Sequence, residues 1–208
     1  MLNNLQVGMD WSDRLLIAFA VLYLTVIAVG IAGADLHASA DEVSGGDAWL
    51  LITSSLAVVP TLEIPQLILL AAAVGIVIWR HGPKLWWSCA AVGHIGAALV
   101  SYAVIGVAIW LGSESADATA ARADYGISII LAATLGAMTA GALAAPKDER
   151  SRADQVVIAL GIIGLVGMLA FSIGWYDMQH AIGYGIGFAL AGWLIDRRVF
   201  AWTRPRRG

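Results

Sequence analysis

The chain has 208 residues, of which 60% are hydrophobic and only 13% are charged. A soluble domain is about 45–50% apolar and about 25% charged, so this composition excludes an ordinary soluble fold and indicates a protein embedded in a lipid bilayer. The net charge of −3 and the lack of a basic face leave no nucleic-acid footprint in the sequence.

Six apolar stretches are candidates to cross a hydrocarbon core of about 30 Å, which takes roughly 20 residues of helix. In chain order, the predicted spans are Leu15–Gly33, Ile64–Trp79, Trp86–Leu111, Tyr125–Ala145, Gln155–Ile173 and Met178–Ile195. The first could be mistaken for a signal peptide, but acids rather than a basic cluster precede it, so we expect a retained helix. Residues 1–208 are thus predicted to form one all-α transmembrane domain that ends in a basic tail, 197–208.

One further apolar segment, Ala48–Pro60, is only about a dozen residues long, which is too short to span a bilayer. It is also too apolar for an open loop, so we expect it to lie in the membrane interface or to re-enter the membrane. Pro65, near the start of the second span, suits the first turn of a helix.

The six predicted spans place basic and acidic residues on opposite sides of the membrane. One side of the membrane receives every lysine and arginine except Arg122, out of 12 in the chain. Because cytoplasmic connections are rich in Lys and Arg, this side is predicted to be the cytoplasm, and both termini lie there. The arginines of the tail are expected to anchor the last helix to anionic lipid. The other side carries acids: Asp35, Asp41, Glu42, Asp47, Glu114, Asp117, Asp124 and Asp177.

Ser128 and His180 lie about one turn inside the fourth and sixth spans, which both enter from the outer face. At a rise of 1.5 Å per residue, each should lie roughly 5–6 Å inside its helix start. Small residues continue from both, and such stripes let two membrane helices pack closely. The two stripes are Ser128, Ala132, Gly136 and Ala140, and His180, Gly183, Gly187 and Ala191. If the stripes face each other, the serine hydroxyl meets the imidazole near the outer surface.

A serine next to a histidine base is the minimal apparatus for nucleophilic acyl transfer, because the imidazole takes the hydroxyl proton as the oxygen attacks a carbonyl. A second interpretation stays open at this point. Ser128 would then serve only as a small residue for close packing, and His180 would hydrogen-bond a neighbouring backbone group.

The same residues resemble the rhomboid family of intramembrane serine proteases, whose six-helix core carries a Gly-x-Ser-Gly motif on the fourth helix and His-x-x-Gly-x-x-x-Gly on the sixth. Gly126-Ile127-Ser128 matches the first three positions of the serine motif, and His180 with Gly183 and Gly187 matches the histidine motif in full. Trp49–Ser54 is similar to the stretch that opens the family's large first loop. Asp124–Ser128 and Gly93–Gly96 look most like divergent actinobacterial members.

The resemblance implies a rhomboid-like bundle in the plasma membrane, the inner membrane of a bacterium, with Ser128 as nucleophile and His180 as general base. Its substrates would be transmembrane segments of other membrane proteins, and no cofactor or metal would be needed. Gly126, Asp124, Gly183 and Gly187 would support the site. Backbone N–H groups at the start of the fourth helix would hold the oxyanion.

The sequence also departs from the family pattern. Ile129 replaces the last glycine of the serine motif, and Ala132 stands where the family often has an aromatic residue. The family's His-x-x-x-Asn pair on the second helix corresponds to Glu63–Leu67, in which Gln66 is the only amide. These changes favour an alternative, a catalytically inactive rhomboid-like protein that acts as an accessory subunit or binding partner in a larger membrane complex. A third hypothesis is a small transporter or lipid-handling protein, although no internal repeat is evident.

Other polar or reactive residues are open to more than one interpretation. His94 is expected in the cytoplasmic half of the third span, where it is badly placed to assist Ser128. It could be a buried histidine bonded to a helix carbonyl, a contact with another subunit, or a ligand. Asp124 could cap the fourth helix or orient His180. Cys89 is the only cysteine, which excludes an internal disulfide, and it is expected to be a buried, inert thiol.

Overall fold

The computed structural model of the chain describes residues 10–29, 36–57, 63–170, 174–197 and 199. Within these ranges all regular structure is helical, and the one isolated bridge pairs Ala38 with Asp124. The long helices are α1 (Trp11–Ala28), α4 (Glu63–His81), α5 (Pro83–Trp110), α7 (Ile127–Leu143), α8 (Arg152–Ala170) and α9 (Met178–Asp196). The short elements are α2 (Ala40–Gly45), α3 (Leu50–Thr53), η2 (Ser54–Leu56), α6 (Glu114–Ala120) and η3 (Trp175–Asp177).

The prediction of an all-helical protein is confirmed for the described residues, and each predicted span coincides with one long helix. Three helical stretches, Trp11–Ala28, Ile64–His81 and Pro83–Trp110, are long and apolar enough to cross a membrane. The helix Ile127–Leu143 is apolar but shorter. The ends of the predicted first and fifth spans, at Gly33 and Ile173, lie outside the described residues.

Local capping explains why several helices begin earlier than hydropathy alone predicts. Asp10 caps α1 by accepting the Asp13 N–H at 2.8 Å. Gly82, with a φ of 87°, precedes Pro83 at the start of α5, where proline is well tolerated because its missing N–H has no helical acceptor. Pro65 lies in the first turn of α4, as predicted.

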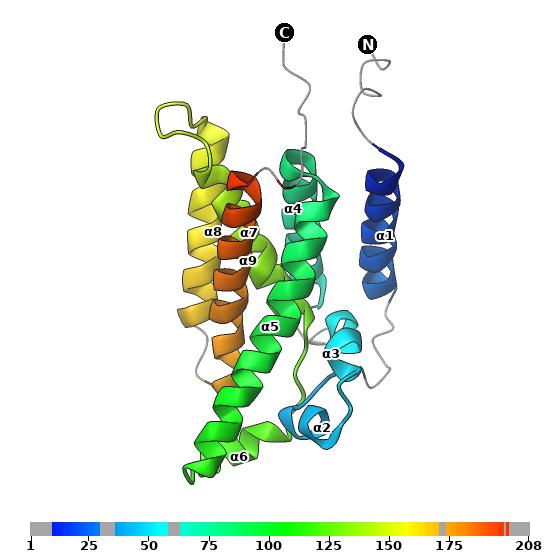
Figure 1. Cartoon of the computed structure of the whole chain (residues 1–208), viewed down its shortest axis with the longest axis vertical. Coiled ribbons are helices and arrows are strands. Elements are labelled where there is room, and N and C mark those ends of the chain that lie inside the picture. Colours follow the sequence, from blue (N-terminus) through cyan, green and yellow to red (C-terminus); the bar gives the residue numbers. More distant parts are fainter. Residues whose placement is uncertain (1–9, 30–35, 58–62, 171–173, 198, 200–208) are drawn as a thin grey trace.

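The long helices run alternately in opposite directions, and Figure 1 shows the start of α1, the end of α9 and the α7–α8 connection at the same end of the molecule. The short helices α2 and α6 lie at the opposite end. Most of α7 is buried, because it contacts α4, α5, α8 and α9. Side chains on the outer helices, such as Phe19 and Ile163, are exposed, as expected for surfaces that face lipid.

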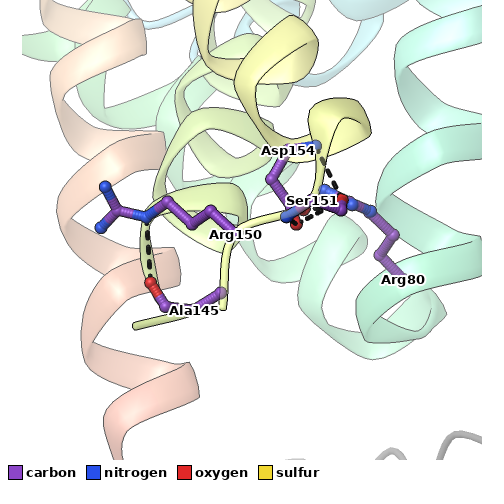
Figure 2. Close-up of polar contacts among 5 residues, drawn as sticks. All are labelled: Arg80, Ala145, Arg150, Ser151 and Asp154. Atoms are coloured by element: carbon purple, nitrogen blue, oxygen red, sulfur yellow. Dashed lines mark hydrogen bonds and ion pairs between the residues drawn. The ribbon is translucent and has the colours of Figure 1, made fainter. Parts of the chain in front are cut away.

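Polar contacts tie the helices together at the end where α8 begins (Figure 2). Ser151 and Asp154 cap α8 reciprocally: the Asp154 carboxylate accepts the Ser151 N–H at 2.9 Å, and the Ser151 hydroxyl accepts the Asp154 N–H at 3.2 Å. Asp154 also forms an ion pair with Arg80 of α4, and both side chains are largely buried. Arg150 donates to the Ala145 carbonyl at 3.0 Å and to the Leu143 carbonyl at 3.0 Å, and the second bond satisfies an acceptor that the end of α7 leaves open.

The apolar segment after the first long helix does not extend as a loop over the surface. Its described part forms α3 and η2, in which Leu51 and Ser54 are buried while Trp49 and Ile52 are exposed. The Tyr23 hydroxyl of α1 donates to the Ser55 carbonyl at 2.7 Å. The segment therefore packs against the helices, whereas residues 58–60 of the predicted interfacial stretch lie outside the described residues.

Candidate functional site

The structure brings Ser128 and His180 into direct contact. Ser128 is the second residue of α7 and His180 the third residue of α9, and the Ser128 Oγ lies 2.9 Å from the His180 Nε2. Both side chains are partly exposed, so a reactant could reach them. The distance lies within the roughly 2.6–3.2 Å over which a base can take a proton from a hydroxyl.

Close packing of α7 against α9 sets this contact. A Cβ at Gly187 would lie 2.7 Å from the Ala133 carbonyl carbon, and a Cβ at Gly183 would lie 3.0 Å from the Ile129 side chain. A Cβ at Gly136 would likewise lie 2.8 Å from the Phe188 nitrogen. The glycines thus let the two backbones approach each other, as expected for small residues between membrane helices.

The predicted stripe on α7 needs a correction. Gly183 and Gly187 pack most closely against Ile129 and Ala133, one residue around the helix from the predicted Ser128–Ala132 row. Gly136 belongs to the predicted stripe, and a Cβ there would meet backbone atoms of α9. The reason is that a row spaced by four residues drifts around a helix of 3.6 residues per turn.

The Ser128 hydroxyl has two neighbours. Besides the imidazole, its Oγ lies 3.1 Å from the Tyr125 carbonyl oxygen, which can only accept a hydrogen bond. If the hydroxyl proton points to Tyr125, then His180 must carry its proton on Nε2; if it points to His180, then Nε2 is the free base. Nucleophilic chemistry requires the second arrangement, in which the imidazole accepts the proton.

The start of α7 is built around Gly126. Its N–H donates to the Ser54 carbonyl at 2.9 Å, and its carbonyl accepts the Ile129 and Ile130 N–H groups, each at 3.1 Å. A Cβ at this position would lie 2.7 Å from the Ser54 oxygen and closer still to the His94 ring, so only glycine fits. The Ile127 and Ser128 N–H groups come before the first hydrogen bonds of α7, which the Ile129 and Ile130 N–H groups donate, so they have no acceptor within the helix.

His94 lies closer to the start of α7 than the sequence led us to expect, but its described hydrogen bonds do not reach Ser128. The His94 ring packs beside Gly126, two residues before the serine, and its Nε2 lies 2.8 Å from the Leu51 carbonyl and 3.3 Å from the Ser54 hydroxyl. The ring is almost completely buried, which agrees with the interpretation of a buried histidine bonded to a helix carbonyl. His94 lies near the middle of α5, and α7 begins next to this part of the helix, so the ring lies close to the residues before Ser128.

The Asp124 side chain does not cap α7, and the hydrogen bonds described for its carboxylate go to α5 and to the residue before His180. The residue before α7 is Gly126, and no side chain caps the helix. The buried Asp124 carboxylate instead accepts from the Tyr102 hydroxyl at 2.7 Å and from the Gln179 amide at 2.9 Å, and its backbone pairs with Ala38. Burial raises the pKa of the Asp124 carboxyl, and these two hydrogen bonds offset part of that rise.

Two of the residues that depart from the rhomboid pattern lie in the packed interior of the protein. Ile129 and Ala132 are both fully buried, and Ile129 meets Gly183. The Gln66 Oε1 is buried, and in the described part of the chain it has no hydrogen-bond partner. Among the described residues, no group of three or more His, Cys, Asp or Glu side chains could hold a metal ion. Cys89 is buried, as expected.

Two polar residues near the pair, Gln179 and Tyr102, were not predicted from the sequence. Gln179 is 1% exposed and immediately precedes His180. A polar side chain in the first turn of an apolar helix is costly unless it faces a polar partner. The position of Gln179 in the apolar sixth span could therefore have indicated a buried polar contact. The partner, Asp124, lies far away in the sequence and could not be assigned without the fold.

No family model matches this sequence, and comparisons with curated proteins and with solved structures find no similar protein. The geometry defines an all-helical protein compatible with a membrane location, with a serine and a histidine in hydrogen-bond contact at the start of two closely packed helices.

Proposed function

We propose that this protein is a rhomboid-like intramembrane serine protease that cuts transmembrane segments of other membrane proteins. The observation that carries the proposal is the 2.9 Å contact between the Ser128 Oγ and the His180 Nε2. Two residues of complementary chemistry, predicted to meet from their matching depth and glycine spacing, do lie together in a partly exposed position.

In the proposed reaction His180 takes the proton of Ser128 as the serine oxygen attacks the carbonyl carbon of the scissile peptide bond. The resulting oxyanion is held by the N–H groups of Ile127 and Ser128, where the positive end of the α7 dipole adds to the stabilisation. His180 then gives its proton to the leaving amine. Water, deprotonated by the same imidazole, hydrolyses the acyl-serine ester and restores the free hydroxyl.

We further propose that all six long helices cross the plasma membrane and that both termini lie in the cytoplasm. Two observations support this arrangement. The helices alternate in direction (Figure 1), and the end that carries Arg80, Lys84, Arg150 and Arg152 is the basic side expected to face the cytoplasm. Such a protein would cut its substrates from the outer face of the bilayer.

The alternative is an inactive rhomboid-like protein that serves as an accessory subunit or binding partner in a membrane complex. It is favoured by the Glu63–Leu67 stretch, which lacks the His-x-x-x-Asn pair that helps to hold the oxyanion in rhomboids and has Gln66 as its only amide. Losing one oxyanion donor costs about 10²–10³ in rate. The contact between Ser128 and the Tyr125 carbonyl is also compatible with a hydroxyl that is not poised for attack.

Labelling of the purified protein in detergent with a fluorescent fluorophosphonate separates the two functions. A protease is labelled in the wild type, and labelling is lost in both Ser128→Ala and His180→Ala. Ser88→Ala is the matched control, because the Ser88 hydroxyl only bonds to the Lys84 carbonyl in α5, and it retains wild-type labelling. A folded wild-type protein that takes no label would contradict the protease and favour the inactive alternative.

A further inference from the structure

A buried polar cluster lies beside the Ser128–His180 pair. Asp124 and Gln179 are 7% and 1% exposed, and the Gln179 Nε2 donates to the Asp124 Oδ2 at 2.9 Å. The same carboxylate oxygen accepts the Tyr102 hydroxyl at 2.7 Å. One oxygen atom therefore joins α5, the residues before α7 and the first turn of α9.

The backbone of Asp124 is fixed by two hydrogen bonds to Ala38. Its N–H donates to the Ala38 carbonyl at 2.7 Å, and its carbonyl accepts the Ala38 N–H at 3.1 Å. Two residues later Gly126 is fixed to Ser54. The carboxylate is consequently a rigid point of attachment, and whatever it binds is positioned relative to the start of α7, where Ser128 lies.

Gln179 is the α9 residue that binds the Asp124 carboxylate, and His180 follows it directly in the chain. The Asp124–Gln179 bond is a directional contact that ties the first turn of α9 to the residues before α7. The Ser128–His180 distance depends on the rotation and height of that turn relative to α7. Glycine packing at Gly183 and Gly187 brings the helices together, but glycines present no side chain that could prevent rotation or sliding.

We infer that Asp124 and Gln179 are positioning residues whose hydrogen bond sets the His180 imidazole against Ser128. This inference rests on the proposed function for its catalytic consequence, whereas the positioning itself is a property of the fold. Tyr102 binds the same carboxylate oxygen from α5 and is not adjacent to either residue of the pair. The loss of its hydroxyl therefore removes an equivalent bond without releasing α9.

Nitrogen NMR of histidine side chains in the full-length protein tests the positioning directly. His180→Ala assigns the signal, and Ser128→Ala gives the Nε2 shift of an imidazole that has lost its serine partner. We expect Gln179→Met and Asp124→Ala to move the His180 Nε2 signal to the Ser128→Ala value. Tyr102→Phe should leave it at the wild-type value, as should Asp124→Asn, because the asparagine carbonyl replaces the accepting oxygen.

The rate of fluorophosphonate labelling per folded molecule provides the second readout. Misplacing a catalytic group by about 1 Å can cost 10²-fold, so Gln179→Met should slow labelling by up to about 100-fold and Tyr102→Phe by far less. A purely structural cluster would lower the melting temperature in both variants and change neither readout. A wild-type Nε2 signal in folded Gln179→Met overturns the inference. An unlabelled wild type whose signal still moves in Gln179→Met overturns the protease alone.

Discussion

The contact between Ser128 and His180 should depend on a glycine that is two helical turns away from it. A Cβ at Gly187 would lie 2.7 Å from the Ala133 carbonyl carbon and closer still to its oxygen. These are backbone atoms of α7, which cannot rotate away as a flexible side chain could. The substitution Gly187→Ala must therefore push α9 away from α7.

The displacement can be worked out from these distances. An ordinary contact begins at 3.4 Å, so the carbonyl carbon alone requires a separation of about 0.7 Å. The nearer oxygen requires more, so if α9 moves as a rigid body, the Ser128–His180 distance rises from 2.9 Å to at least about 3.6 Å, beyond the roughly 2.6–3.2 Å range for proton transfer. Overpacking of this kind costs about 1–3 kcal/mol in unfolding free energy.

Gly185→Ala is the matched control, because nothing lies within 4 Å of a Cβ at that position on the same helix. Replacing glycine by alanine in an open helical position gains up to about 1 kcal/mol. We expect Gly187→Ala to melt below the wild type in detergent and to lose fluorophosphonate labelling, whereas Gly185→Ala melts at or above it and is labelled normally. Equal melting temperatures and labelling in the two variants would refute the packing argument.

Two further predictions concern the polar contacts at the end where α1 and α8 begin. Replacing Asp154 with alanine leaves the buried Arg80 guanidinium without its ion-pair partner. This should lower the free energy of unfolding by about 3–5 kcal/mol, which is measured as lost thermal stability. A loss below about 1 kcal/mol would show that the ion pair is effectively solvated. Hydrogen bonds from Ser12, the Asp13 N–H and Lys84 lower the pKa of Asp10 to about 2. The stabilisation from its charge is therefore complete above about pH 4 and is lost as the pH falls towards 2. Asp10→Asn keeps a capping oxygen, and its unfolding free energy should lack this pH dependence. If the unfolding free energies of Asp10→Asn and the wild type change with pH in the same way, the Asp10 carboxylate is not the source of the stabilisation.

The helices of this protein could be predicted well because hydropathy and capping are local properties. The predicted span Trp86–Leu111 and the observed α5, Pro83–Trp110, differ by three residues or fewer at each end. The contact between Ser128 and His180 was also predictable from their matching depth in two helices rich in small residues, although the row of α7 that meets the α9 glycines was not. The rhomboid relationship and the catalytic function remain predictions.

The surroundings of the pair could not be predicted in the same way. The proximity of His94 to Gly126 was not expected, because the sequence does not show that α7 begins beside the middle of α5. Asp124 was interpreted either as the cap of the fourth helix, since an acid just before a helix is a common cap, or as a partner that orients His180. Its actual partners come from α5 and α9, and no local pattern encodes such distant pairings.

By itself the sequence determined a chain of apolar helices, their approximate ends, and the two faces on which a serine and a histidine lie. The tertiary structure alone decided how deep α7 begins, which row of its residues meets the glycines of α9, and that Gln179 reaches Asp124. The physical reason is that hydropathy acts along one helix at a time. The offset and rotation between helices depend instead on backbone contacts and buried hydrogen bonds between residues far apart in the chain.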